Sequence, residues 1–373
     1  MPCLAETCVV AITSHFLIGL PWIWGFMLGF VLAAVSPAVV VPCLLALQEK
    51  GWGVAKGIPT LVIAAASVDD VLAISAFTII LGITFNPSAD LASVILQGPL
   101  EALVGVVFGL FWGVLAVFLP PSPNPSTILR LLVLVGGALL ALFGSDVVGL
   151  PGSGALAVLV MAFVSGVGWR RQGWGDNNPV TQALAAAWVV LQPLLFGLIG
   201  TEIQVAALDG GTVGWGVVVL CCGLMVRMVV SYVAVMMGDL NMKERMFVAL
   251  AWLPKATVQA AIGPLALDKA KQALATRFPG QDCNPVMVDI KEPLPGTTLV
   301  RDMVNGTMVQ GYSGDGGDLL VTLCDMVTYG DKVLTIAVLV ILITAPIGAI
   351  AIMTGGPKLL ENDSGRKTEE EKA

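Results

Sequence analysis

Long apolar runs separated by short polar connections dominate the pattern along this chain. A helix needs about 20 apolar residues to cross a bilayer, and ten runs approach or exceed that length. They lie at roughly 2–19, 22–47, 57–83, 93–119, 127–149, 153–168, 179–200, 213–238, 244–266 and 333–355. The pattern predicts an all-α polytopic membrane protein of about ten transmembrane helices.

The basic residues orient these predicted spans. Alternate connections carry lysine or arginine, whereas the short connections near 85–92, 145–152 and 201–212 carry none. The basic positions are Lys50, Lys56, Arg130, Arg170, Arg171, Lys243, Arg245, Lys358, Arg366, Lys367 and Lys372. Basic residues concentrate in the cytoplasmic loops of membrane proteins, so we expect a multi-pass protein with both termini in the cytoplasm.

Two groups of three spans share one layout. In each group a helix with one charged residue comes first, Glu6 or Arg227, and a helix interrupted by proline follows. The groups enter the membrane from opposite sides, and such paired interruptions indicate the binding site of a secondary transporter. The expected parts are a first triplet at 1–84, linker and dimer or scaffold helices at 85–212, a second triplet at 213–356 with a polar insert at 269–331, and a cytoplasmic tail at 357–373.

Composition supports the membrane assignment and excludes an ordinary soluble domain. Only 12% of the residues are charged, where soluble domains carry about 25%, and the mean hydropathy is +0.89. The seven cysteines follow no metal-binding spacing.

Charged residues inside the predicted spans are the candidate chemistry. Asp69 and Asp70 lie side by side near the middle of the third span. An acid at the centre of a membrane helix costs about 2.5–3.5 kcal/mol, so the pair indicates a function, most simply the binding of a cation. With Glu6, Arg227 and Lys255 there are five such groups, and we expect them to pair or to face a water-filled cavity.

Four segments resemble the animal sodium/proton antiporters of the solute carrier 9B family. The segments are Gly29–Pro42, Ser67–Ile74, Gln192–Gly200 and Ala251–Gly263. That family is similar in fold to bacterial Na⁺/H⁺ antiporters of the second cation/proton antiporter class. The resemblance covers nearly the whole chain except 270–330, and it implies an inverted-repeat antiporter fold with two proline-broken crossing helices.

The resemblance also implies roles for individual residues. Asp70 would carry the ion or the proton, and Asp69 beside it would lend negative potential. Glu6 would pair with Arg227, and Lys255 would be a partner of the acidic site or of the crossing helix ends. The crossover of the broken helices would contain Ser36, Pro37, Pro42, Pro254 and Thr257.

Two features depart from the family's pattern. Family members carry a cytoplasmic tail and three or four further helices before the position of Met1, so we expect an N-terminally shortened form with a weakened homodimer. Residues 270–330 replace a short connection and lie on the non-cytoplasmic side. There Asn305 is a candidate for N-glycosylation, and Cys283 and Cys324 are candidates for a disulfide.

The leading interpretation is a secondary active transporter that exchanges Na⁺ or Li⁺ for H⁺ by alternating access. A carboxylate that holds either a cation or a proton, but not both, couples the two flows by competition. The alternative is a transport-deficient truncated isoform that acts as a regulatory or partner subunit of a full-length antiporter. An intramembrane aspartyl protease is excluded, because no span carries its Tyr-Asp or Gly-x-Gly-Asp motif.

The remaining expectations concern surroundings and partners. We expect no enzyme activity, no cofactor, no nucleic-acid partner and no metal other than the transported cation at Asp69 and Asp70. The protein would contact lipid in the plasma membrane or an endomembrane, the mitochondrial inner membrane included. Glu101 and Glu202 are interpreted as solvated carboxylates near span ends, and His15 as a hydrogen-bonded residue at a helix end rather than a pH sensor.

Overall fold

Helices make up nearly all of the computed structural model of this chain. It describes residues 1–85, 91–119, 126–174, 178–201, 210–278, 283, 298–304, 307–313 and 315–362. Within these ranges the helices are α1 Pro2–Ile18, α2 Trp22–Ala33, α3 Pro37–Glu49, α4 Ile58–Phe85, α5 Leu91–Phe118, α6 Thr127–Val148, α7 Pro151–Arg171, α8 Pro179–Thr201, α9 Gly210–Ala234, α10 Met242–Ala251, α11 Thr257–Ile262, α12 Leu265–Arg277 and α13 Asp315–Leu359. Two strands, β1 Thr298–Val304 and β2 Thr307–Ser313, form a hairpin.

The number of membrane crossings differs from the prediction. Seven helices of the described part are long and apolar enough to cross a membrane, with α2 and α3 taken together as Trp22–Glu49. The predicted spans at 2–19 and 179–200 correspond to shorter apolar helices, and the span at 244–266 is divided among α10, α11 and the start of α12. The multi-pass helical character is confirmed, whereas the count of ten is not.

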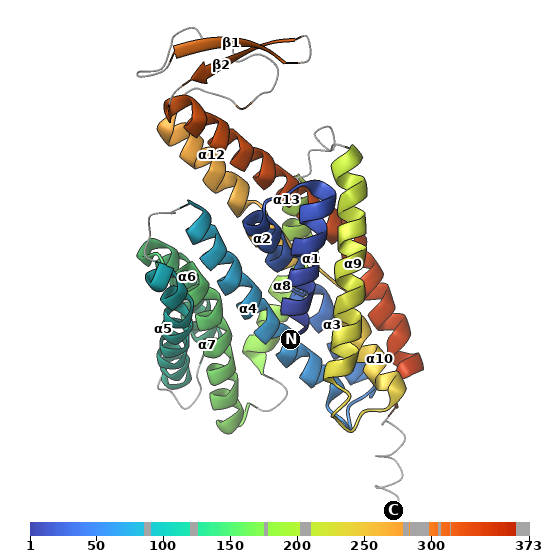
Figure 1. Ribbon diagram of the computed structural model, residues 1–373. Coiled ribbons are helices and arrows are strands. Elements are labelled where there is room, and N and C mark those ends of the chain that lie inside the picture. The colour runs from blue at the N-terminus through green and yellow to red at the C-terminus, as the bar shows by residue number, and fades with distance from the viewer. Residues whose placement is uncertain are drawn as a thin grey trace, which may run out of the picture.

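Helix α4 lies between two groups of helices (Figure 1). In one group α7 packs against both α5 and α6, and in the other α1 packs against α2 and α9. Helix α4 contacts α2 and α3 on one side and α5 and α7 on the other. The element that carries the paired aspartates is therefore shared by both groups.

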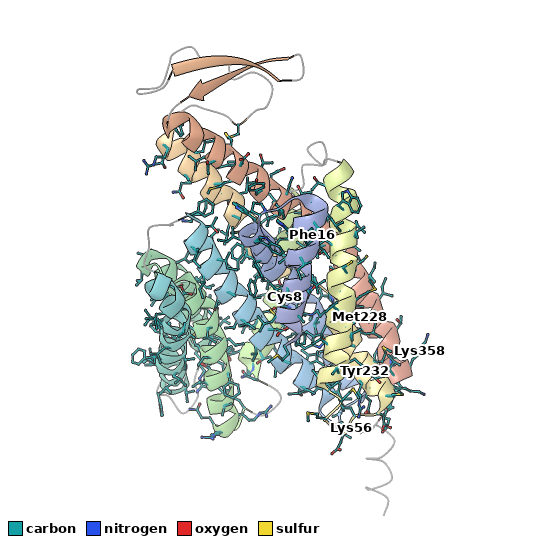
Figure 2. The ribbon with its side chains drawn as sticks, viewed as in Figure 1. Cys8, Phe16, Lys56, Met228, Tyr232 and Lys358 are labelled. Atoms are coloured by element: carbon teal, nitrogen blue, oxygen red, sulfur yellow. A yellow bond between two sulfur atoms is a disulfide. The ribbon has the colours of Figure 1, made fainter. Side chains whose placement is uncertain are left out.

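Helices α1 and α9 begin the two predicted triplets and run side by side in opposite directions. Figure 2 shows Phe16 near the upper end of α1 and Tyr232 near the lower end of α9. Glycine allows this close packing, because a Cβ added at Gly223 of α9 would lie 2.9 Å from the Val10 side chain of α1. Such opposed partners are what an inverted repeat requires.

The predicted polar insert is helical at both of its ends. Helix α12 continues to Arg277, and α13 begins at Asp315, well before the predicted span at 333–355. Leu274 and Phe278 of this region pack against Leu323 of α13. Apolar residues inside the polar stretch therefore bury one another, which explains why these two helices extend past the membrane span.

The hairpin and one disulfide lie in the same region. The strands pair antiparallel from Thr298 opposite Ser313, and they lie beyond the end of α12 (Figure 1). Cys283 and Cys324 form a disulfide with a Cα–Cα distance of 5.3 Å. The candidate glycosylation residue Asn305 lies outside the described residues.

Candidate ion-binding site

Two helices are interrupted, and proline accounts for both breaks. The first break is at residues 34–36, between α2 and α3, and the second is at 252–256, between α10 and α11. Proline disfavours helical backbone in the residue before it, and Ser36, which precedes Pro37, is extended with φ −90° and ψ 104°. Pro254 lies inside the second break, where it supplies no N–H to a helix.

The two unwound segments touch each other. The N–H of Ser36 donates to the carbonyl of Pro254 at 3.0 Å, and the Ser36 hydroxyl lies 3.4 Å from that of Thr257. Pro37 begins α3, and Pro42 lies one turn further along the same helix. The structure thus brings Ser36, Pro254 and Thr257 together at the crossover, whereas Pro42 is an exposed residue inside α3.

The backbone carbonyls at the C-terminal end of α2 are satisfied by side chains from the second half of the chain. The last carbonyls of a helix have no partner within it. Gln259 Nε2 donates hydrogen bonds to the carbonyls of Val31 and Ala34, at 3.0 and 2.7 Å. Lys255 donates to the carbonyl of Leu32, and Arg227 donates to that of Ala33. Positive charge at a helix C-terminus also complements the helix dipole, so these cations stabilise the break.

The same two cations form a buried network with two acids. Arg227 pairs with Glu6 and, at 2.7 Å, with Asp69, while Lys255 Nζ lies 2.9 Å from Glu6. Arg227, Lys255 and Glu6 are fully buried, and the ring of Trp252 lies 5.2 Å from the guanidinium. Two positive and two negative charges balance, which is the condition under which buried ion pairs are tolerated.

Asp70 stands apart from this network. Its Oδ1 accepts a hydrogen bond from the backbone N–H of Val35 at 2.9 Å, and the residue is only 7% exposed. In the part of the chain that the structure describes, its carboxylate forms no salt bridge with a lysine or arginine. A buried carboxylate without a cationic partner is costly, so Asp70 remains the candidate for binding a cation or a proton.

Known proteins share this architecture. The family model described as the transmembrane sodium/hydrogen exchanger matches residues 2–290. The chain belongs to this family. Sodium/hydrogen exchanger 9B2 of Xenopus tropicalis is 42% identical over 371 residues, covering 99% of this chain and 59% of that protein. The human 9B2 protein is 40% identical over 371 residues, with the same two shares, and human 9B1 is 37% identical over 362 residues, covering 96% of this chain and 59% of its own length.

The chain therefore spans about three fifths of the length of these relatives. A solved structure, that of the sodium proton antiporter MjNhaP1 from Methanocaldococcus jannaschii at pH 8, superposes with a TM-score of 0.68 at 16% identity. It covers 96% of this chain and 76% of that one. The predicted antiporter fold and the resemblance to the 9B proteins are confirmed, and the relatives that this chain matches are exchangers, which are transporters rather than enzymes.

In this chain, the two neighbouring aspartates have different partners. Successive helix residues point about 100° apart, so Asp69 faces Arg227 while Asp70 faces the break in α2. The Asp69 carboxylate is bound to Arg227, and its predicted role of lending negative potential to Asp70 stays a prediction. Lys255 contacts Glu6 and the end of α2 rather than either aspartate.

Three further acids and bases were interpreted from the sequence. Glu101 is only 1% exposed, so its interpretation as a solvated carboxylate was wrong. A side chain at Gly152 of α7 would approach both Glu101 and Ser75 of α4, which places this acid between α4, α5 and α7. His15 lies near the end of α1 with its Nδ1 2.7 Å from the Leu20 carbonyl, and Glu202 lies outside the described residues.

Two contributors were missed by the sequence analysis. Gln259 joins α11 to the end of α2, and the hydroxyl of Thr344 in α13 accepts the backbone N–H of Lys255 at 3.2 Å. Each is an uncharged polar residue within an apolar run, and charge alone does not reveal such positions. Both are now part of the scaffold that holds the break in place.

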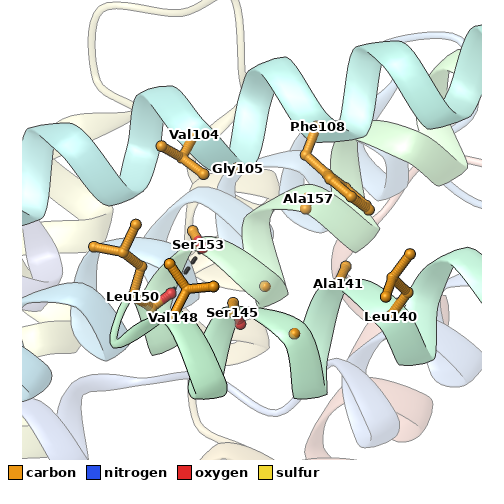
Figure 3. A pocket seen from close by; sticks show the side chains of 12 residues that line it. Val104, Gly105, Phe108, Leu140, Ala141, Ser145, Val148, Leu150, Ser153 and Ala157 are labelled. Carbon is orange, nitrogen blue, oxygen red and sulfur yellow. Dashed lines mark hydrogen bonds between the residues drawn. The ribbon is translucent and has the colours of Figure 1, made fainter.

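A separate cavity lies away from this chemistry. It measures about 270 Å³ and lies between α5, α6 and α7, lined by residues such as Val104, Phe108 and Leu140 (Figure 3). Its two hydroxyl groups are engaged within their own helices, Ser145 with the Leu142 carbonyl and Ser153 with that of Leu150. The lining carries no charge, so this cavity does not suit a bare cation.

Proposed function

We propose that this exchanger moves Na⁺ or Li⁺ against H⁺ by alternating access, with Asp70 holding the cation and the proton in turn. The observation that carries the proposal is the position of Asp70, a buried carboxylate outside a balanced network of charges. The family supports exchange of sodium for protons, and the burial and hydrogen bonding of Asp70 support the choice of this carboxylate.

Charge balance gives a reason for coupling. The network of Glu6, Asp69, Arg227 and Lys255 sums to zero, so Asp70 decides the net charge of the site. A bound proton or a bound monovalent cation neutralises it, whereas an empty site carries one buried negative charge. Because burying such a charge is costly, the loaded site would cross the membrane more readily than the empty one.

Asp69 acts indirectly in this proposal. Its carboxylate holds Arg227 at 2.7 Å, and Arg227 in turn holds the end of α2, from which the Val35 N–H reaches Asp70. Loss of Asp69 would therefore disturb the position of the binding carboxylate and the stability of the network.

Proton flux in reconstituted vesicles tests the proposal. The 373-residue chain, its Asp70→Asn variant and an exposed control, Glu49→Gln, are compared under Na⁺, Li⁺ and K⁺ gradients. We expect Na⁺ and Li⁺ to drive proton movement in the parent and the control, and no such movement with Asp70→Asn. Parent-like rates in Asp70→Asn would refute the assignment, and an inactive parent would favour the alternative of a transport-deficient partner subunit.

We also propose that both termini face the cytoplasm. Lys56 and Lys358, from two of the basic connections, lie at the same end of the molecule (Figure 2), and basic residues favour the cytoplasmic side. A reporter tag after the tail should react in intact cells only after permeabilisation, and labelling without it would refute this orientation. The homodimer and the choice of membrane stay predictions.

A further inference from the structure

Gln259 joins the two broken helices at the peptide group next to Asp70. Its Nε2 donates to the carbonyl of Ala34 at 2.7 Å. That carbonyl and the N–H of Val35 belong to one peptide group, and the N–H donates to Asp70 Oδ1 at 2.9 Å. The side chain amide, the peptide and the carboxylate thus form a continuous chain of hydrogen bonds.

We infer that Gln259 is a positioning residue that sets how strongly Asp70 holds a cation in competition with a proton. The inference rests on the proposed function of Asp70. Linked hydrogen bonds polarise one another, by about 10–30% per bond, so a peptide whose carbonyl accepts a bond is a stronger N–H donor. A stronger donor favours the charged carboxylate, which is the form that binds a cation.

The local chemistry requires an amide rather than a generic buried side chain. Gln259 is fully buried, and both N–H groups of its amide are needed for the two carbonyls of α2 that it contacts. Its Oε1 has no hydrogen-bond partner among the residues that the structure describes. A buried acceptor without a partner is unfavourable, so the contribution of this residue lies in its donors.

Gln259 takes no part in the ion pairs that the other charges around Asp70 form. On the neighbouring elements these charges are Asp69 of α4, Glu6 of α1, Arg227 of α9, Lys255 of the second break and, further along α4 beside Ser75, Glu101 of α5. The ion pairs among the first four do not include Gln259. A change in the competition at Asp70 can then be assigned to the hydrogen-bond chain.

Gln259→Met tests the inference, because methionine has a similar length and no N–H. Initial rates of Na⁺-driven proton movement are measured in vesicles over a pH series. Without the polarised N–H donor, the protonated form of Asp70 is favoured. The acidic limb of the rate–pH profile should therefore shift to higher pH by about half a unit. The same change corresponds to roughly a threefold rise in the Na⁺ KM at fixed pH, with Vmax little altered.

A matched control separates this effect from a general loss of packing. Ser14→Ala removes a buried hydroxyl of α1 that donates only to the Ala11 carbonyl of its own helix, and it should leave both the limb and KM unchanged. If Gln259→Met lowers Vmax or thermal stability while its acidic limb coincides with that of the parent, the role is structural and the inference is overturned.

A second readout does not depend on transport. A bound cation stabilises the folded protein by an amount that depends on the ratio of its concentration to its Kd, so thermal unfolding in detergent is followed against Na⁺ concentration. Gln259→Met should need about threefold more Na⁺ for the same stabilisation, and an equal requirement overturns the inference. A parent chain without transport activity would refute the proposed function. The Na⁺ dependence of unfolding would still test the inference in that case, because it measures binding rather than transport. If the methionine variant does not fold, Gln259→Asn, whose shorter side chain withdraws the donor, takes its place.

Discussion

Glu6 is expected to keep the buried charge network neutral, and its replacement measures that role. Glu6→Gln preserves the size of the side chain and removes a negative charge shared by Arg227 and Lys255. Arg227 retains Asp69, so the uncompensated charge falls on Lys255, which is fully buried. Breaking a buried pair in this way costs about 3–5 kcal/mol.

Thermal unfolding in detergent can resolve a change of this size. With an unfolding entropy of about 2.1 cal/mol/K per residue, the loss corresponds to a Tm lower by roughly 4–6 °C for 373 residues. Glu49→Gln, an exposed change at the end of α3, serves as the control and should leave Tm within about 1 °C.

The double variant decides whether the charges are coupled. Lys255→Met alone also destabilises, because Glu6 loses one partner and the Leu32 carbonyl loses its donor. In the double variant, Glu6→Gln with Lys255→Met, the network is neutral again. The double variant should therefore lose about 0.5–3 kcal/mol less unfolding free energy than the two single variants lose together. Strictly additive losses would show that the two charges do not stabilise each other, and the argument from charge balance would fail.

Two further predictions concern packing and pH. Gly29→Ala places a Cβ 2.7 Å from the Thr7 carbonyl, and it should lower the unfolding free energy by about 1–3 kcal/mol because it separates α1 from α2. Gly82→Ala is the control, since the space around Gly82 is open, and it should be close to neutral. Equal changes in Tm for the two variants would contradict this prediction. The hydrogen bond from Lys56 to Glu244 raises the pKa of Lys56. The contribution of this pair to the stability of the folded protein is therefore complete at neutral pH, and it is lost as the pH rises through the raised pKa. Lys56→Met should therefore lower Tm at neutral pH, and the difference from the parent should vanish in strongly alkaline buffer rather than persist.

Much of the fold follows from local features of the sequence. The apolar runs predict the positions of α4, α5, α6 and α9, because a helix in lipid must satisfy its own backbone and present apolar side chains. The prolines predict the breaks, since Pro37 and Pro254 prevent continuous hydrogen bonding there. The helical ends of the insert were missed because they depend on contacts between distant residues, such as Leu274 with Leu323, that no local pattern contains.

The candidate site was harder to predict in its pairings than in its members. Its five charged residues can be found from the sequence because charge in an apolar run is conspicuous. Which acid pairs with which base depends on the direction in which each side chain leaves its helix. Asp69 and Asp70 point about 100° apart, and Asp69 is the one that binds Arg227. Gln259 carries no charge, and its importance becomes visible only when the end of α2 lies against it.

The closure of α2 by later residues has a consequence for biosynthesis. The donors to its final carbonyls lie between 194 and 228 residues further along the chain. At about 5–20 residues per second, a ribosome needs roughly 10–45 s to make that stretch. During this interval the newly inserted first half holds bare carbonyls and two acids without their cations, which bilayer lipid cannot satisfy. The nascent chain therefore depends on water or on the insertion machinery until its second half arrives, and a ribosome stalled between the halves would leave these carbonyls without their donors.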